Sequence, residues 1–144
     1  MNGRPGVCAC AVALALLQAC ASPTENCAVP RGITGTWQYA ATQDAPVRAT
    51  LTGSLMITNQ SCRDFRGALD VTEVTADGRS RRIAGPVSGL LLDSVVARFD
   101  ATLGGADRQH LARFGGDSLW GSWVEIQSAS SVTGSFSGRR PETR

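Results

Sequence analysis

The sequence predicts an all-β domain, an eight-stranded antiparallel up-and-down meander closed into a barrel, after a short apolar segment at the N-terminus. Apolar and polar residues alternate with a period of two along most of the chain after residue 34, which is typical of half-buried strands. Short turns separate these runs, and such turns join antiparallel neighbours. The sequence after the N-terminal segment contains no amphipathic helical pattern of useful length. Closing the meander removes both unpaired edges of the sheet.

Residues 1–19 have the composition of a secretory signal peptide. Arg4 and the α-amino group supply positive charge before an uninterrupted apolar run from Val7 to Leu17. The apolar region of a signal peptide spans about 7–15 residues, whereas a membrane-spanning helix needs about twenty. The run is too short to span a bilayer, so we expect the chain to be exported.

The residues Leu17-Gln18-Ala19-Cys20 resemble the lipobox of bacterial lipoproteins. The resemblance implies cleavage before Cys20 and attachment of lipid to its thiol, so that residues 20–33 form a lipidated tether and an acyl anchor enters the lipid bilayer. Ala21 occupies the position of the inner-membrane retention Asp, which implies an outer-membrane lipoprotein facing the periplasm. The alternative is ordinary cleavage after Ala21, which would release a soluble periplasmic protein.

The cysteines divide into those used by export and one remaining pair. Cys8 and Cys10 leave with the signal peptide and Cys20 takes the lipid, so Cys27 and Cys62 are left in an oxidising compartment. We therefore predict a disulfide between them. A metal site is the alternative, but the chain has one His and no Cys-x-x-Cys pair, so no metal is expected.

The barrel domain is expected over residues 34–140, followed by a polar C-terminal tail over 141–144. From Val47 to Thr58 the odd positions are apolar or Gly and the even positions are polar with one exception. The same alternation recurs in the third, fifth and eighth segments, and turn residues delimit the others; Asp77-Gly78 is the strongest hairpin turn. The expected strands are 35–42, 47–58, 64–75, 80–88, 94–103, 108–115, 119–126 and 131–139.

Gly35-Thr36-Trp37 on the first strand resembles the Gly-x-Trp motif of the lipocalin and avidin group, a calycin-type barrel. In that group the Trp packs across one end of the barrel under a basic residue from the last strand. Strand parity selects Arg140 for this position, because it shares the inward face of Phe136, and a guanidinium over an indole stabilises by about 0.5–2 kcal/mol. Tyr39 stands where avidin-like proteins carry a biotin-binding Asn, so the resemblance does not extend to biotin.

The resemblance and the barrel architecture favour a protein that binds a small apolar or amphipathic ligand in its interior. The residues expected to line the cavity are Leu55, Leu69, Phe99, Trp120 and Phe136. Trp123 is then expected to face outward. Two alternatives remain: a protein-binding or protease-inhibitor-like module that acts through its rim or N-terminal tail, and a structural envelope lipoprotein without a ligand.

The sequence predicts neither an enzyme nor a nucleic-acid-binding protein. A net charge of +2 gives no electrostatic footprint for nucleic acid. His110 is the one candidate general base, but no motif places a nucleophile or an orienting partner beside it, and the facing of its strand is not decided by the alternation. A phosphate loop, a metal cluster and a nucleophile elbow are all missing from the sequence, so no cofactor is expected. The oligomeric state is not determined by these patterns.

Overall fold

The structure is a computed structural model that describes residues 27, 30–126 and 132–142. The predicted signal peptide, Cys20 and most of the predicted tether lie outside the described residues. Within the described ranges, the structure has no helix long and apolar enough to cross a membrane.

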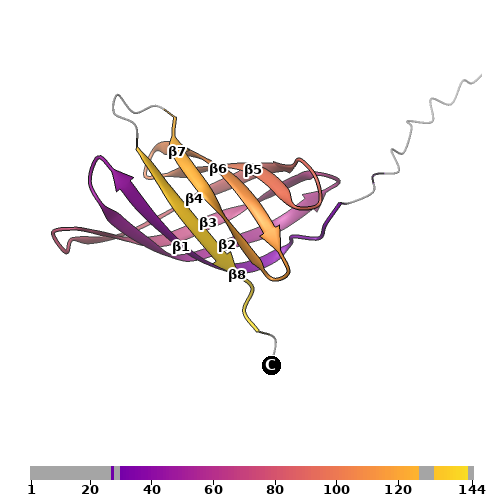
Figure 1. Cartoon of the computed structure of the whole chain (residues 1–144), viewed down its shortest axis with the longest axis horizontal. Coiled ribbons are helices and arrows are strands. Elements are labelled where there is room, and N and C mark those ends of the chain that lie inside the picture. Colours follow the sequence, from indigo (N-terminus) through magenta and orange to yellow (C-terminus); the bar gives the residue numbers. More distant parts are fainter. Residues whose placement is uncertain (1–26, 28–29, 127–131, 143–144) are drawn as a thin grey trace, which may run out of the picture.

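Eight antiparallel strands form a closed barrel in sequence order, which confirms the predicted fold class (Figure 1). The strands are β1 (Gly35–Ala45), β2 (Ala49–Ser61), β3 (Asp64–Thr75), β4 (Ser80–Leu91), β5 (Val96–Leu103), β6 (Ala106–Gly115), β7 (Ser118–Glu125) and β8 (Thr133–Arg139). Each strand pairs with its neighbour in the chain, and β8 pairs with β1 to close the barrel. All eight predicted strands are present, with ends displaced by a few residues.

Glycines let the strands coil tightly enough to close. A Cβ atom built on Gly85 would lie 1.6 Å from the carbonyl oxygen of Thr102, and one on Gly134 would lie 1.8 Å from that of Thr42. In each case the oxygen belongs to the neighbouring strand, so only a residue without a side chain fits. These positions bend the sheet sharply, as a small barrel requires.

Successive connections alternate between the two ends of the barrel, because each strand runs antiparallel to the one before it. We call the end that holds the turns β2–β3, β4–β5 and β6–β7 the base, and the end that holds the other four connections the mouth. Both termini of the barrel leave at the base, because β1 begins there and β8 ends there. The N-terminal segment covers the base, where Ile33 is buried and its backbone N–H donates to Oε1 of Gln60 at 3.0 Å.

Candidate functional site

Trp37 closes the base of the barrel. Its side chain is buried, its ring centroid is 5.8 Å from that of Phe114, and its Nε1–H donates to the carbonyl of Ile33 at 3.0 Å. The guanidinium of Arg140 stacks over the indole, with Cζ 4.6 Å from the ring centroid, and donates to the carbonyl of Gly32 at 2.9 Å. The structure thus brings together the Trp and the Arg that the Gly-x-Trp resemblance paired.

The predicted disulfide between Cys27 and Cys62 is confirmed, with the two Cα atoms 5.3 Å apart. It joins the N-terminal segment to the turn between β2 and β3 at the base. Gln60 adds a second attachment, because its Nε2–H donates to the carbonyl of Arg31 at 2.8 Å. The chain before β1 is therefore held across the base beside Trp37.

Four of the five residues predicted to line a cavity point into the barrel but belong to its packed core. Leu55, Leu69, Phe99 and Phe136 are all buried. The enclosed space bordered by Leu55 and Phe99 near the base measures about 10 Å³. A water molecule needs about 10–15 Å³ and small-ligand pockets about 300–1,000 Å³, so this part of the interior has no room for a ligand.

The prediction that Trp120 faces inward and Trp123 outward is wrong. Trp120 is 47% exposed, whereas Trp123 is 3% exposed and lies inside the barrel. Val124 and Ile126 are apolar but lie on the outer face with Trp120, so the apolar positions of this strand are not all inward positions. The inward face of β7 also carries Glu125, although polar residues of a half-buried strand usually face solvent.

His110 and Tyr39 form the middle layer of the interior. The carbonyl of Arg108 accepts a hydrogen bond from Nδ1–H of His110 at 3.0 Å, so Nε2 accepts one from the Tyr39 hydroxyl at 3.1 Å. The imidazole stacks on Phe99 with ring centroids 4.4 Å apart. Burial lowers the pKa of His110 to about 4 and raises that of Tyr39. At neutral pH both side chains are uncharged and hold each other in place.

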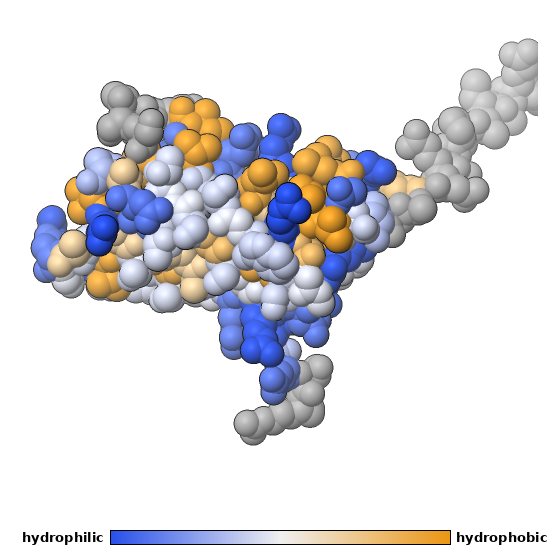
Figure 2. All heavy atoms as spheres, viewed as in Figure 1, coloured by the Kyte–Doolittle hydropathy of each residue, from blue (hydrophilic) through white to orange (hydrophobic). Residues whose placement is uncertain are grey.

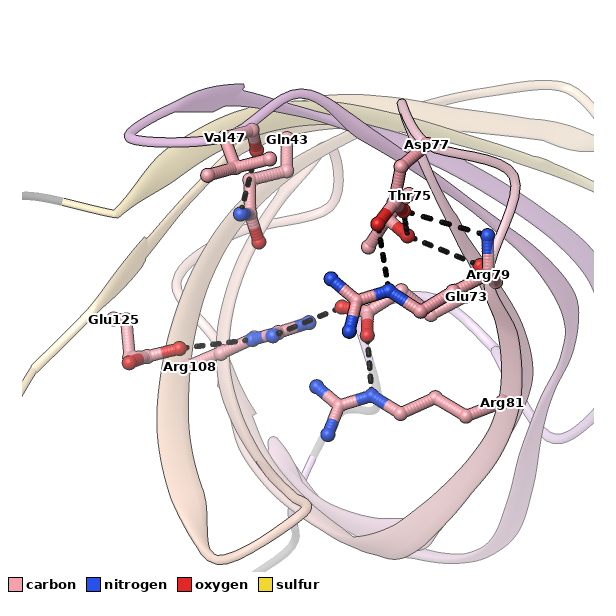
Figure 3. Close-up of polar contacts among 9 residues, drawn as sticks. All are labelled: Gln43, Val47, Glu73, Thr75, Asp77, Arg79, Arg81, Arg108 and Glu125. Atoms are coloured by element: carbon pink, nitrogen blue, oxygen red, sulfur yellow. Dashed lines mark hydrogen bonds and ion pairs between the residues drawn. The ribbon is translucent and has the colours of Figure 1, made fainter.

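Four charged side chains cross the barrel just below its mouth. Arg108 on β6 extends toward Glu73 on β3, a strand with which β6 does not pair, so this contact spans the lumen (Figure 3). Arg108 Nη2 lies 3.8 Å from Glu73 Oε1, and its Nε lies 3.3 Å from Glu125 Oε2. Arg81 on β4 pairs with the second oxygen of Glu73. The result is a chain of alternating charges that sums to zero.

Two buried N–H groups in this layer lack a partner in the described part of the chain. Arg108 is 5% exposed and its guanidinium lies 4.8 Å from the centroid of Trp123, yet its Nη1 and the Nε1 of that indole make no hydrogen bond. Leaving a buried donor unsatisfied costs about 1–3 kcal/mol. Such groups point to an acceptor outside the described residues, for example water or a ligand.

A hollow of about 380 Å³ opens at the mouth beside the charged chain. It is lined by Glu73, Thr75, Arg79, Ser80 and Arg81, and its volume lies within the range of small-ligand pockets. A larger hollow of about 610 Å³ runs along the outer face of β5 to β8 and reaches Trp123 beside Gly134. Of these two hollows, the one at the mouth is bordered by members of the charged chain.

The membership of Glu73, Arg108 and Glu125 in this site does not follow from the apolar–polar alternation of the sequence. Strand parity predicts that two of these side chains point into the barrel. Glu73 lies two residues after the buried Val71, and Arg108 lies two residues before the buried His110. Polar residues were treated as outward, although a small barrel can turn charges inward where they pair with one another.

No protein-family profile and no curated protein sequence matches this chain. Solved structures with the same fold do match. EF1p2_mFAP2b bound to DFHBI superposes with a TM-score of 0.61 and 15% identity over 75% of this chain and 93% of that one. A fluorescence-activating β-barrel designed de novo gives a TM-score of 0.56 and 17% identity over 76% and 94%. The redesigned β-barrel mFAP1 bound to DFHBI gives 0.57 and 17% over 74% and 94%. At these identities the likeness shows the fold alone.

Proposed function

We propose that this chain is a binding protein of the bacterial envelope whose barrel takes a small amphipathic ligand at its mouth. The observation that supports this most is the pair of unpartnered, buried N–H groups of Arg108 and Trp123 in the described part of the chain. Arg108 pairs with Glu73, which lines the mouth hollow of about 380 Å³, and Trp123 lines the outer hollow. An acceptor oxygen of the ligand binds these two donors. The packed space near the base, about 10 Å³, keeps the ligand in the upper part of the barrel.

The charges around the two donors favour a neutral acceptor, such as a carbonyl or amide oxygen. The Arg81–Glu73–Arg108–Glu125 chain already sums to zero, and a carboxylate would add an unbalanced charge to a buried layer. The less polar part of the ligand lies against the aliphatic stems of the arginines that line the hollow. Two of the structural neighbours, EF1p2_mFAP2b and mFAP1, are bound to DFHBI, so barrels with this fold can hold a small molecule.

The N-terminal sequence supports export and anchoring through Cys20, with the outer membrane as the destination. The chain enters the barrel at the base, so an anchor there leaves the mouth free to receive a ligand. The role is binding and not catalysis, because the most perturbed titratable pair, Tyr39 and His110, is buried, uncharged and satisfied internally. Mass spectrometry of the protein from its host should find a diacylglyceryl group on Cys20.

A matched pair of variants tests the ligand site. Trp123→Phe removes one unpartnered donor and keeps an aromatic ring inside the barrel, whereas Trp120→Phe makes the same change on the outer face. Small molecules that copurify with the host-expressed protein are identified by extraction and mass spectrometry, and their affinity is measured by titration. The loss of one hydrogen bond should weaken ligand binding by Trp123→Phe about 2- to 10-fold. The affinity of Trp120→Phe should equal that of the wild type. Equal affinity in both variants would refute the site.

A structural envelope protein without a ligand is the second candidate, and the packed interior near the base favours it. In that case ordered water satisfies Arg108 and Trp123. A crystal structure of the host-purified protein separates the two candidates. Electron density of a small molecule at the mouth supports binding, and water alone on both donors, with no copurifying molecule, supports the structural role.

A further inference from the structure

Arginines outnumber carboxylates at the base of the barrel but not at the mouth. The base segments are residues 30–37, 60–66, 90–98, 113–120 and 139–142; the mouth segments are 43–50, 73–82, 100–109, 123–126 and 132–134. The base segments contain seven arginines and four acidic residues, a net charge of +3. The mouth segments contain five arginines and six acidic residues, a net charge of −1. The molecule therefore has a positive end and a slightly negative end.

Ion pairing makes this difference larger. Four of the five mouth arginines pair with carboxylates: Arg79, Arg81, Arg82 and Arg108. Among the described residues, Arg139 is the only base arginine in an ion pair, and its partner Glu142 is highly exposed and 3.8 Å away. The other base arginines stack on rings, bind backbone carbonyls or extend from the surface. Most of the positive charge at the base is thus free to act on an external partner.

Exposed apolar side chains lie among these charges. Leu92 and Val95, in the turn between β4 and β5, are 44% and 45% exposed, and Trp120 on β7 is exposed to a similar degree. Trp120 pairs across the sheet with Arg113, and Arg63 donates to the carbonyl of Leu92 at 3.0 Å. Figure 2 shows orange side chains with blue ones between them at the end from which the N-terminal chain leaves.

We infer that the base of the barrel docks on the surface of an anionic lipid bilayer. Trp and Arg suit the interface, because each combines an apolar body with a polar group that stays in water. Unpaired arginines attract anionic headgroups. The disulfide holds Cys27 at this same end, seven residues after Cys20, the predicted site of lipid attachment. The barrel then stands with its mouth turned away from the membrane, whether or not the mouth binds a ligand.

Trp120 provides a local probe, because Trp37 and Trp123 are buried. The full-length chain is mixed with vesicles of phosphatidylcholine, with or without about one third phosphatidylglycerol, whose acyl chains carry bromine as a quencher. Tryptophan emission should be quenched by the anionic vesicles, and the quenching should disappear in Trp120→Phe. Emission from vesicle-bound protein that remains as accessible to acrylamide as in free protein would overturn the inference.

Two triple variants with the same net charge separate the base from the rest of the surface. Arg63→Ser/Arg113→Ser/Arg139→Ser removes three positive charges from the base, and Arg48→Ser/Arg79→Ser/Arg82→Ser removes three from the mouth. The quenching of Trp120 emission should fall about five-fold or more in the base variant, and raised salt should have the same effect on the wild type. The mouth variant should retain it. Equal loss in both variants overturns the inference, as does a Trp120-dependent dimer in analytical ultracentrifugation, which would make the surface a protein interface.

Discussion

At the base of the barrel Arg31 and Arg140 stack on aromatic rings and bind backbone carbonyls, whereas four of the five arginines at the mouth pair with carboxylates. Arg140 over Trp37 and Arg31 over Phe114 cover an apolar core. Arg108 crosses the lumen between Glu73 and Glu125. A ring quadrupole attracts a guanidinium without cancelling its charge, so the base stays positive, whereas the carboxylates neutralise the mouth.

The same eight strands thus form an apolar environment at the base and a charged one at the mouth. Apolar packing stabilises the base in proportion to the area that it buries. The mouth holds buried charges whose desolvation offsets most of their attraction, so it adds little stability. We therefore expect the stability of the domain to come from the base and the middle layer, and recognition of a ligand to come from the mouth.

The largest expected effect is at the base. Trp37→Ala removes one of the two buried tryptophan side chains, leaves a cavity and deprives Arg140 of its ring, so the free energy of unfolding should fall by about 3–5 kcal/mol. Trp120→Ala, on the exposed surface, should change it by less than about 1 kcal/mol. Urea denaturation measures both values. Equal losses would show that the base is not the principal source of stability.

The disulfide should have the next largest effect. It closes a loop across a sequence separation of 35 residues, so the double variant Cys27→Ser/Cys62→Ser should lose about 3–4 kcal/mol through the greater entropy of its unfolded chain. Thermal melting of the oxidised wild type and the double variant measures the difference. A matching pair of substitutions at exposed serines, Ser94→Ala/Ser137→Ala, controls for general sensitivity. An unchanged melting temperature would mean that the bridge does not hold the N-terminal segment.

The middle layer should make stability depend on pH. Burial lowers the pKa of His110 to about 4, so below its ordinary value of about 6.5 the unfolded chain binds a proton that the folded protein does not. The free energy of unfolding should therefore fall by about 3 kcal/mol between pH 6.5 and pH 4, and this group should cause no further loss below that. The double variant Tyr39→Phe/His110→Phe removes the titrating group with its partner. Parallel pH profiles of variant and wild type would contradict this account.

The sequence was sufficient for the fold because period-two alternation and turn residues act locally. All eight strands, their order and the disulfide between Cys27 and Cys62 are present in the structure. The placement of Arg140 over Trp37 needed one more step, the parity of the last strand. Each of these features depends on neighbours in the chain or on a single register.

The candidate site was harder to predict because it depends on contacts across the lumen. Arg108 and Glu73 are far apart in the chain and lie on strands that do not pair, so no local pattern joins them. On β7 the outward face carries Trp120 and Val124, which reversed the predicted facing of that strand. The free space of the interior is a property of packed volumes, and alternation alone cannot supply it.

The two ends of the barrel chain meet at the base, where a guanidinium N–H of Arg140 donates to the carbonyl of Gly32 at 2.9 Å. A short linker can therefore join them, and new termini can be opened in the exposed turn at Asp77-Gly78 without interrupting a strand. Such a circular permutant would keep every strand pairing. An anchor fused to its new N-terminus would leave from the mouth, so the mouth would face the membrane and the base would face away from it.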